Sequence, residues 1–182
     1  MITDKTTYKY YLERDLAAYQ LSKLSFYNYW WMDCLRFQRR LRKIEYLHNV
    51  RKSNPFCQIY LFLLEAINHR LAVRLGLTIP KNVCGAGLCI VHYGTIVISH
   101  NAKIGENLRI HPSTSIGNYN GTPQIGDNVY IGPGAKLFGN IHIGNNVAIG
   151  ANAVVNKDIP DNVTVGGIPA KIISEKSWLE KE

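Results

Sequence analysis

Residues 104 to 155 read IGENLRIHPSTSIGNYNGTPQIGDNVYIGPGAKLFGNIHIGNNVAIGANAVV, and an aliphatic residue returns in this stretch at nearly every sixth position, usually followed by glycine. The aliphatic residues are Ile104, Ile110, Ile116, Ile125, Ile131, Leu137, Ile143, Ile149 and Val155. A period of six fits neither the 3.6-residue repeat of a helix nor the alternation of an ordinary strand. It predicts a repeat architecture in which each hexad forms one short strand and one turn.

Stacked hexads form a solenoid, because no single hexad can bury its own apolar side. The aliphatic residue is expected to point inward, and the glycine permits a tight corner. The fifth position of each hexad, also small or aliphatic, is a second inward-facing site: Leu108, Thr114, Val129, Ala135, Ile141, Val147 and Ala153. An antiparallel meander would not keep its register over so many hexads. The sequence therefore predicts a mainly β protein built on a parallel β-helix.

The chain has 182 residues and a formal net charge of +8, which allows one domain with an appendage. Much of the excess charge lies between residues 36 and 52, and it favours an anionic membrane surface or anionic substrates. No nucleic-acid-binding motif accompanies it, so we expect no nucleic-acid partner. Four scattered cysteines, no signal peptide and an apolar run of only residues 59–64 predict a cytoplasmic protein.

The N-terminal region, residues 1–76, is predicted to be helical. Residues 4–20 have an N-cap candidate in Asp4, and residues 25–48 form an amphipathic helix with a basic outer face, which packs on the protein or lies on the inner face of a membrane. A third helix begins near Asn54 and ends at Gly76. The inward positions of the last two helices are predicted to be Trp30, Cys34, Phe37, Leu41 and Ile44, then Ile59, Phe62, Leu63, Ala66, Ile67 and Leu71.

The β-helix is predicted to occupy residues 77–173, since the six-residue phase continues backwards through Cys84, Ile90 and Ile96. Residues 174–182 form a charged tail, expected to be a short helix or a frayed end. Because the interior of the solenoid is aliphatic, its chemistry must lie on the outside, at corners or between subunits.

His92 is the candidate for that chemistry. It lies beside Gly94, which would allow a ligand close approach, and a neutral imidazole can accept a proton from a hydroxyl as a general base. The alternative is a surface histidine that forms hydrogen bonds in a turn.

The hexads, the segment Gly87 to Gly94 and the closing Gly167-Ile168-Pro169-Ala170-Lys171 together resemble the hexapeptide-repeat acyltransferases, in their serine acetyltransferase-like branch. The resemblance implies a left-handed β-helix, an exception to the usual crossover hand. It also implies a homotrimer that binds acetyl-CoA between neighbouring subunits, with no metal. Within that branch, the sequence is closest in character to the O-acetyltransferases of capsular or exopolysaccharide synthesis.

Carried over by position, the resemblance makes His92 the catalytic base. It assigns cofactor binding to glycine-rich corners and to one basic residue near the cofactor's phosphates, namely Gly132, Gly134, Ala135, Gly150, Ala151 and Lys171. Leu77 stands where serine acetyltransferases have the aspartate that orients the histidine, and Thr122 stands in place of a second histidine. An arginine for an amino-acid carboxylate is also missing, and the loop 118–124 is short. These departures favour acetylation of a sugar or polysaccharide precursor, with L-serine as the alternative acceptor.

Two other functions share the fold. A metalloenzyme of the carbonic anhydrase type would use three histidines from two subunits, but the spacing of His92, His100, His111 and His142 does not suggest a ligand set. A non-catalytic trimeric scaffold would use the repeat for assembly alone, with the basic helices docked on a membrane.

Overall fold

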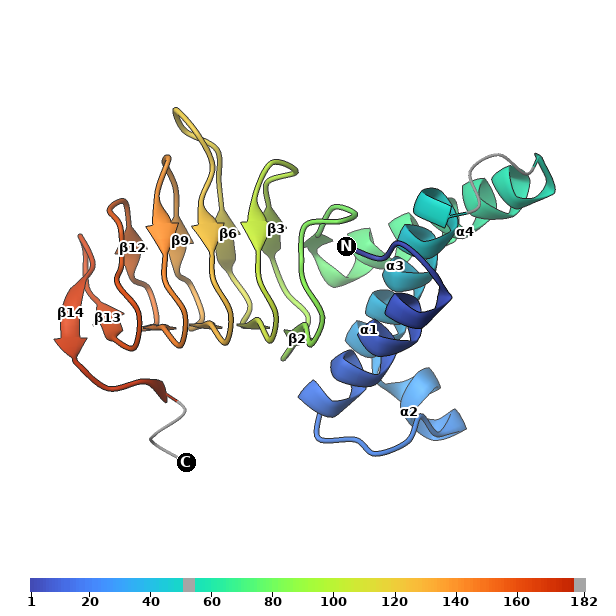
Figure 1. The fold of residues 1–182 in the computed structure, drawn as a ribbon, viewed down its shortest axis with the longest axis horizontal. Coiled ribbons are helices and arrows are strands. Elements are labelled where there is room, and N and C mark those ends of the chain that lie inside the picture. The colour runs from blue at the N-terminus through green and yellow to red at the C-terminus, as the bar shows by residue number, and fades with distance from the viewer. Residues whose placement is uncertain (51–54, 179–182) are drawn as a thin grey trace.

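The computed structural model describes residues 1–50 and 55–178, and within them a group of helices covers the first coil of a long β-solenoid (Figure 1). The described helices are α1 (Lys5–Ala18), α2 (Phe26–Trp31), α3 (Asp33–Val50) and α4 (Pro55–Leu75). Figure 1 shows the solenoid extending away from these helices toward the C-terminus.

α1 begins where the sequence predicts. The Asp4 carboxylate accepts hydrogen bonds from the backbone N–H groups of Thr6 and Thr7, at 2.7 and 2.8 Å, and the Thr7 hydroxyl oxygen accepts one from the Asp4 N–H. This reciprocal arrangement satisfies amides that the first helical turn leaves unpaired.

The single helix expected over residues 25–48 is wrong in two respects. The helix breaks at Met32, where ψ is 83°, so α2 and α3 are separate elements. Trp30, expected to point inward, is 52% exposed, whereas Cys34, Phe37, Leu41 and Ile44 are buried as predicted. Nor is the outer face of α3 uniformly basic, because Arg42 is completely buried. The periodicity could not show this, since it counts arginine as a solvated residue.

α4 begins at Pro55; the predicted cap at Asn54 lies outside the described residues. Most of its predicted inward stripe is exposed, including Ile59, Phe62, Leu63 and Ile67, and only Leu71 of that stripe is buried. The face that α4 buries consists of Asn68, Leu71, Ala72 and Leu75. α4 ends before Gly76, whose φ of +74° favours glycine, as predicted.

The solenoid consists of short strands in three parallel rows, with one antiparallel strand at the end. The strands are β1 (Leu77–Thr78), β2 (Cys89–Ile90), β3 (Ile96–Ile98), β4 (Lys103–Ile104), β5 (Arg109–Ile110), β6 (Thr114–Ile116), β7 (Gln124–Ile125), β8 (Tyr130–Ile131), β9 (Lys136–Leu137), β10 (His142–Ile143), β11 (Ala148–Ile149), β12 (Val154–Val155), β13 (Thr164–Gly166) and β14 (Lys171–Ser174). Their order in the sheets is β1-β3-β6-β9-β12, β10-β7-β4 and β14-β13-β11-β8-β5-β2. The predicted left-handed parallel β-helix is confirmed.

Every aliphatic residue of the hexads quoted above is buried, and so is every fifth-position residue. Strands that follow one another in a row pair in register, for example Ile90 with Ile110 and Ile110 with Ile131. Identical positions therefore stack from coil to coil, which is the packing that the six-residue period predicts.

An asparagine ladder at one corner adds to this stacking and was not predicted. Asn107, Asn128, Asn146 and Asn162 have φ between 57° and 62°, a left-handed conformation that asparagine tolerates. Each side-chain amide of the first three donates to the amide oxygen of the next, at 2.8, 2.9 and 2.8 Å. The ladder satisfies polar groups that each coil alone would leave unpaired.

Of the predicted tail, the structure describes only residues 174–178, so the expected short helix or frayed end stays a prediction. β14 pairs antiparallel with β13 and closes the last coil. The chain then returns along the solenoid, where the Trp178 Nε1–H donates to the Asn128 carbonyl oxygen at 2.8 Å.

No helix in the described ranges is long and apolar enough to cross a membrane. α2 exposes Phe26, Tyr27, Trp30 and Trp31, but membrane contact by the N-terminal helices stays a prediction. Cys34, Cys84 and Cys89 are buried free thiols, and burial raises the pKa of Cys84 to about 12.

Candidate functional site

His92 lies where the chain leaves β2 and turns into β3. Parallel pairing aligns Ile90, Ile110, Ile131 and Ile149, so the residues two positions later, His92, Pro112, Pro133 and Ala151, occupy the same corner of successive coils. We call the turns 91–95, 111–113, 132–134 and 150–152 the His92 corner. The His92 side chain is exposed, so its imidazole is accessible to a substrate.

The helices cover one side of His92 and leave a cavity of about 170 Å³. Tyr19, just after α1, lines it together with Trp31 of α2, Asp33 of α3 and Tyr93 of the solenoid. Asp33 is the one carboxylate among the lining residues, and it forms an ion pair with Arg36. Asp33 is not predictable from the sequence as a site residue, because nothing in its local pattern indicates that α3 begins beside His92.

Leu77, which occupies the position of the orienting aspartate, is 5% exposed and packs in the solenoid core. Its environment is apolar, so this position cannot supply a carboxylate to His92. A charged partner for the imidazole must come from another element, and Asp33 is in the same cavity.

The backbone that leads to His92 is held by polar side chains of the helices. The Tyr19 hydroxyl accepts from the Ile90 N–H at 3.2 Å and lies 3.1 Å from the Ile90 carbonyl oxygen, to which it donates. The Gln38 side-chain amide donates to the Leu88 carbonyl oxygen at 2.7 Å. Because burial raises the pKa of Tyr19 well above its usual range, this hydroxyl stays protonated.

A buried ion cluster fixes the preceding turn. Arg42 Nε donates to Asp15 Oδ2 at 2.8 Å, and Arg42 Nη1 donates to Glu45 Oε2 at 3.0 Å. Nη1 also reaches the Cys84 carbonyl oxygen at 2.9 Å, while Asp15 Oδ1 accepts from the Gly87 N–H at 2.8 Å. Burial alone would lower the pKa of Arg42, but Asp15 and Glu45 outweigh it and raise the pKa. The guanidinium is therefore charged, and it joins α1 and α3 to the first coil.

His111 adds a second imidazole at the His92 corner, one coil along the solenoid. Its ring packs against Tyr130, with centroids 5.1 Å apart, and its Nε2 is buried without a hydrogen-bond partner among the described residues. Burial lowers the pKa of His111 below its ordinary 6.5, and Arg109 and His92 lower it further. From the sequence, His111 is a candidate only as a metal ligand, because local spacing does not show that its ring lies near His92.

Four of the predicted cofactor-binding residues, Gly132, Gly134, Gly150 and Ala151, lie at this corner, whereas Ala135 follows it and is completely buried in the core. Most of their amides already bond between or within coils: the Gly132 N–H donates to Ile149 O and the Gly150 N–H to Val165 O, both at 2.8 Å, and the Gly134 N–H donates to Pro112 O at 3.0 Å. The Ala135 N–H makes a longer bond, 3.4 Å, to Gly132 O. The Ala151 N–H has no partner among the described residues and stands in the same row as His92. Of the predicted amides, Ala151 is thus the one available to a substrate.

The glycines of this corner have a structural role of their own. A Cβ on Gly132 would lie 2.8 Å from the Ala151 nitrogen, and a Cβ on Gly134 would lie 2.0 Å from Asn152 Oδ1. Close stacking of the coils therefore requires glycine there, whatever binds outside.

Lys171 is the first residue of β14 and pairs with Gly166 of β13. Gly166 occupies the position of Gly150 one coil further along the solenoid. The Lys171 side chain is exposed, beyond the last coil at the same corner. The structure thus places Lys171 at the far end of the corner, and its role as a phosphate-binding residue stays a prediction. His100 is exposed on another turn and His142 is exposed on β10, and no cluster of three or more metal-ligating side chains occurs within residues 1–50 and 55–178.

The lowered pKa of His111 predicts a pH effect on stability. The unfolded chain, with an ordinary pKa of 6.5, binds a proton before the folded chain does as the pH falls. The folded state should therefore lose stability from about pH 6.5 down through the lower folded-state pKa, and His111→Gln should remove this loss. Urea unfolding at several pH values between 7.5 and 5 would measure it, with His100→Gln as control. A stability difference between wild type and His111→Gln that stays constant with pH would contradict the prediction.

Comparison with known proteins agrees with this architecture. Residues 122–157 match the family described as bacterial transferase hexapeptide (six repeats). The serine acetyltransferase of Buchnera aphidicola subsp. Acyrthosiphon pisum (strain APS) is 35% identical over 138 residues, 72% of this chain and 48% of the relative. The serine acetyltransferase of Staphylococcus aureus (strain Mu50 / ATCC 700699) is 42% identical over 104 residues, 53% of this chain and 47% of the relative. The chain thus spans about half the length of the curated relatives it matches.

Among solved structures, serine acetyltransferase from Neisseria gonorrhoeae in complex with serine superimposes with a TM-score of 0.73 and 27% identity. The match covers 93% of this chain and 70% of that one, so it includes the helices as well as the solenoid. Residues 122–157 thus carry the repeat of this transferase family, and the helices and solenoid together are similar in fold to a serine acetyltransferase. These relatives are named serine acetyltransferases, which is the alternative that the sequence left open. They give no support to the expected polysaccharide O-acetyltransferase character.

Proposed function

We propose that this protein is an O-acetyltransferase that uses acetyl-CoA, with His92 as its general base. The proposal rests on one observation, that His92 and Ala151 lie in the same row of the His92 corner. Relatives of the chain are named acetyltransferases. An exposed imidazole and an unpaired backbone amide stand in that row, so one extended substrate could contact both. The residues present fit the CoA arm, because Ala151 offers it a free hydrogen-bond donor.

In the proposed reaction, His92 takes the proton of the acceptor hydroxyl as its oxygen bonds to the acetyl carbon. The carbon–sulfur bond then breaks, and the proton passes from His92 to the leaving thiolate. A positively charged imidazole exists between these two transfers, and a carboxylate nearby favours it. Asp33 is proposed for this role, since it lines the same cavity. His111, one coil along the same corner, has a buried Nε2 and is given no role in the transfer.

L-serine is the first candidate acceptor, because the relatives are named serine acetyltransferases and one similar structure contains serine. A sugar hydroxyl is the second candidate, and it has specific observations in its favour. Leu77 is buried and apolar, and Thr122 replaces a histidine. Trp31 and Tyr93, 74% and 70% exposed, line the His92 cavity, where aromatic faces suit sugar rings.

Release of free thiol from acetyl-CoA tests the proposal, with L-serine, simple sugars and oligosaccharide fragments assayed side by side. We expect His92-dependent release with at least one hydroxyl acceptor, and the fastest acceptor decides between the two candidates. L-alanine, which lacks the hydroxyl of L-serine, is the matched control. Absence of turnover with every acceptor would reject the enzyme and favour the trimeric scaffold.

The position of the loop after β6 supports assembly into a homotrimer, which is part of the proposal. His92 precedes the row β1-β3-β6-β9-β12, whereas residues 117–123 follow it, so the loop with Thr122 lies at another corner of the coil. In Figure 1 this loop extends beyond its neighbours and away from β2. It can therefore contribute to a His92 corner only in a neighbouring subunit. Light scattering should give a trimer mass, and an active monomer would contradict this assembly.

A further inference from the structure

The helices α2, α3 and α4 enclose a cavity of about 410 Å³, a volume in the range of small-molecule sites. Four arginines line it, two from α3 and two from α4: Arg36, Arg40, Arg70 and Arg74. Its other lining residues are apolar: Trp30, Ile67 and Leu71. No carboxylate is among the described residues that line this cavity, which we call the arginine pocket.

Only part of this positive charge is balanced within the described chain. Arg36 forms an ion pair with Asp33, and its Nη1 donates to the Trp30 carbonyl oxygen at 2.7 Å. The other three arginines form no hydrogen bond or ion pair with a described residue: Arg40, Arg70 and Arg74. Three of the four guanidinium groups in the pocket are therefore uncompensated.

The spacing of these arginines is unfavourable for the helices that carry them. Arg36 and Arg40 are four residues apart on α3, and Arg70 and Arg74 are four residues apart on α4. Like charges at this spacing repel each other across one helical turn. Because both pairs line one cavity, the packing of α3 on α4 adds repulsion between the helices. A bound anion would replace this repulsion with attraction.

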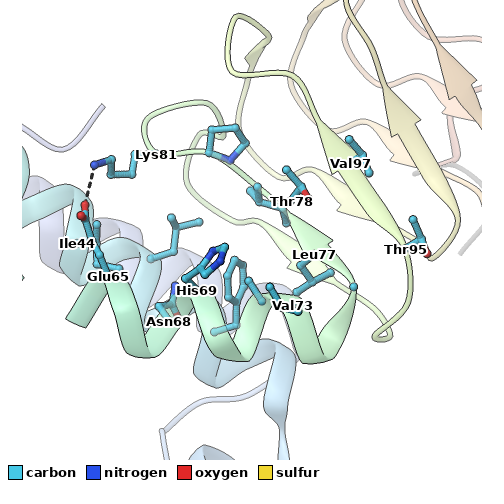
Figure 2. A pocket seen from close by; sticks show the side chains of 16 residues that line it. Ile44, Glu65, Asn68, His69, Val73, Leu77, Thr78, Lys81, Thr95 and Val97 are labelled. Atoms are coloured by element: carbon cyan, nitrogen blue, oxygen red, sulfur yellow. Dashed lines mark hydrogen bonds and ion pairs between the residues drawn. The ribbon is translucent and has the colours of Figure 1, made fainter. Parts of the chain in front are cut away.

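A neighbouring cavity gives a contrast. It has a volume of about 640 Å³ and lies between α4 and the first coil of the solenoid (Figure 2). There Lys81 Nζ forms an ion pair with Glu65 Oε1 at 2.7 Å, drawn as a dashed line in Figure 2. The charges of that cavity satisfy each other, whereas the arginine pocket has no carboxylate of its own among the described residues. Its missing negative charge is expected from a ligand.

We propose that the arginine pocket binds a ligand through a phosphate group that carries two or more negative charges, as in a phosphomonoester or a diphosphate. A guanidinium is planar, and its paired N–H donors match the oxygens of phosphate. Arg70 and Arg74 are exposed and Arg40 is half-buried, so a phosphate can reach all three from solvent. The proposal does not depend on acetyl transfer, because no residue lines both this pocket and the His92 cavity.

Calorimetry with inorganic pyrophosphate and the full chain tests the proposal. Arg70→Gln combined with Arg74→Gln should weaken binding by about tenfold or more, because two charge-assisted contacts are lost. Glutamine is a good helix former, so this variant should stay folded. The matched control is Lys5→Gln combined with Lys9→Gln, which removes the same charge from an exposed pair with the same spacing on α1. At physiological ionic strength the control should bind pyrophosphate like the wild type.

Vesicles distinguish the two sources of such a phosphate group, a lipid headgroup and a soluble compound. Sedimentation with vesicles of phosphatidic acid in phosphatidylcholine, but not of phosphatidylcholine alone, would assign the phosphate to a lipid. Pyrophosphate binding without vesicle binding would assign it to a soluble compound, and either result supports the pocket if the arginine variant loses it. Binding of neither pyrophosphate nor phosphatidic acid by the wild type would overturn the proposal. So would an equal loss in the arginine and lysine variants, since it would show attraction by overall charge alone.

Discussion

His92→Ala should lower the turnover number for acetyl transfer by about 10²–10⁴-fold while the protein stays folded. The imidazole is exposed and is not part of the buried core, so its removal leaves the stacked interior unchanged. Binding of CoA should also persist, because the corner amides come from other coils.

Steady-state kinetics and calorimetry with CoA would measure the two effects separately. His100→Ala and His142→Ala are matched controls, since both histidines are exposed on the same solenoid but away from the His92 corner. Both should retain most of the activity. Near-normal turnover of His92→Ala would show that His92 is not the general base.

Arg42→Met should lower the free energy of unfolding by about 3–5 kcal/mol. The substitution leaves the carboxylates of Asp15 and Glu45 buried without their positive partner. It also removes the hydrogen bond to the Cys84 carbonyl oxygen in the turn that leads to β2. Activity should therefore fall together with stability, although Arg42 touches no substrate in the proposed mechanism.

Urea unfolding would measure the loss, with Arg39→Met as control. Arg39 lies on the same helix but is only half-buried, so its substitution should change stability by about 0.5 kcal/mol or less. Combining Arg42→Met with Asp15→Asn and Glu45→Gln should recover part of the loss, because the buried negative charges disappear. A loss as small as that of Arg39→Met would show that the cluster does not hold the helices to the first coil.

The solenoid could be predicted almost completely from the sequence. Each hexad has the same local pattern, an inward aliphatic residue followed by a turn. The sequence from Ile104 to Val155 therefore specifies the coil without reference to distant residues. The six-residue phase extends back to the first coils through Cys84, Ile90 and Ile96, whereas the end of α4 is predicted by Gly76 as a helix stop. The asparagine ladder was also visible as a repeat, at Asn128, Asn146 and Asn162, but its hydrogen bonds were not anticipated.

The helices were predicted less well, because their environment comes from other parts of the chain. The apolar stripe of Ile59, Phe62 and Leu63 suggests a buried face, yet α3 and the first coil cover the side with Asn68 and Ala72 instead. Likewise, the charge of Arg42 suggests a solvated face until Asp15 is brought beside it by the packing of α1 on α3.

The sequence by itself determined the repeat, its inward residues and the candidacy of His92, since all three depend on spacing within a few residues. Only the tertiary structure decided what surrounds His92: Asp33 from the start of α3, His111 from the next coil and the free N–H of Ala151 two coils further on. These groups are far apart along the chain, and their proximity depends on coil stacking and on where the helices pack. A local pattern cannot encode that arrangement, because the free energy that sets it comes from burial between elements rather than within them.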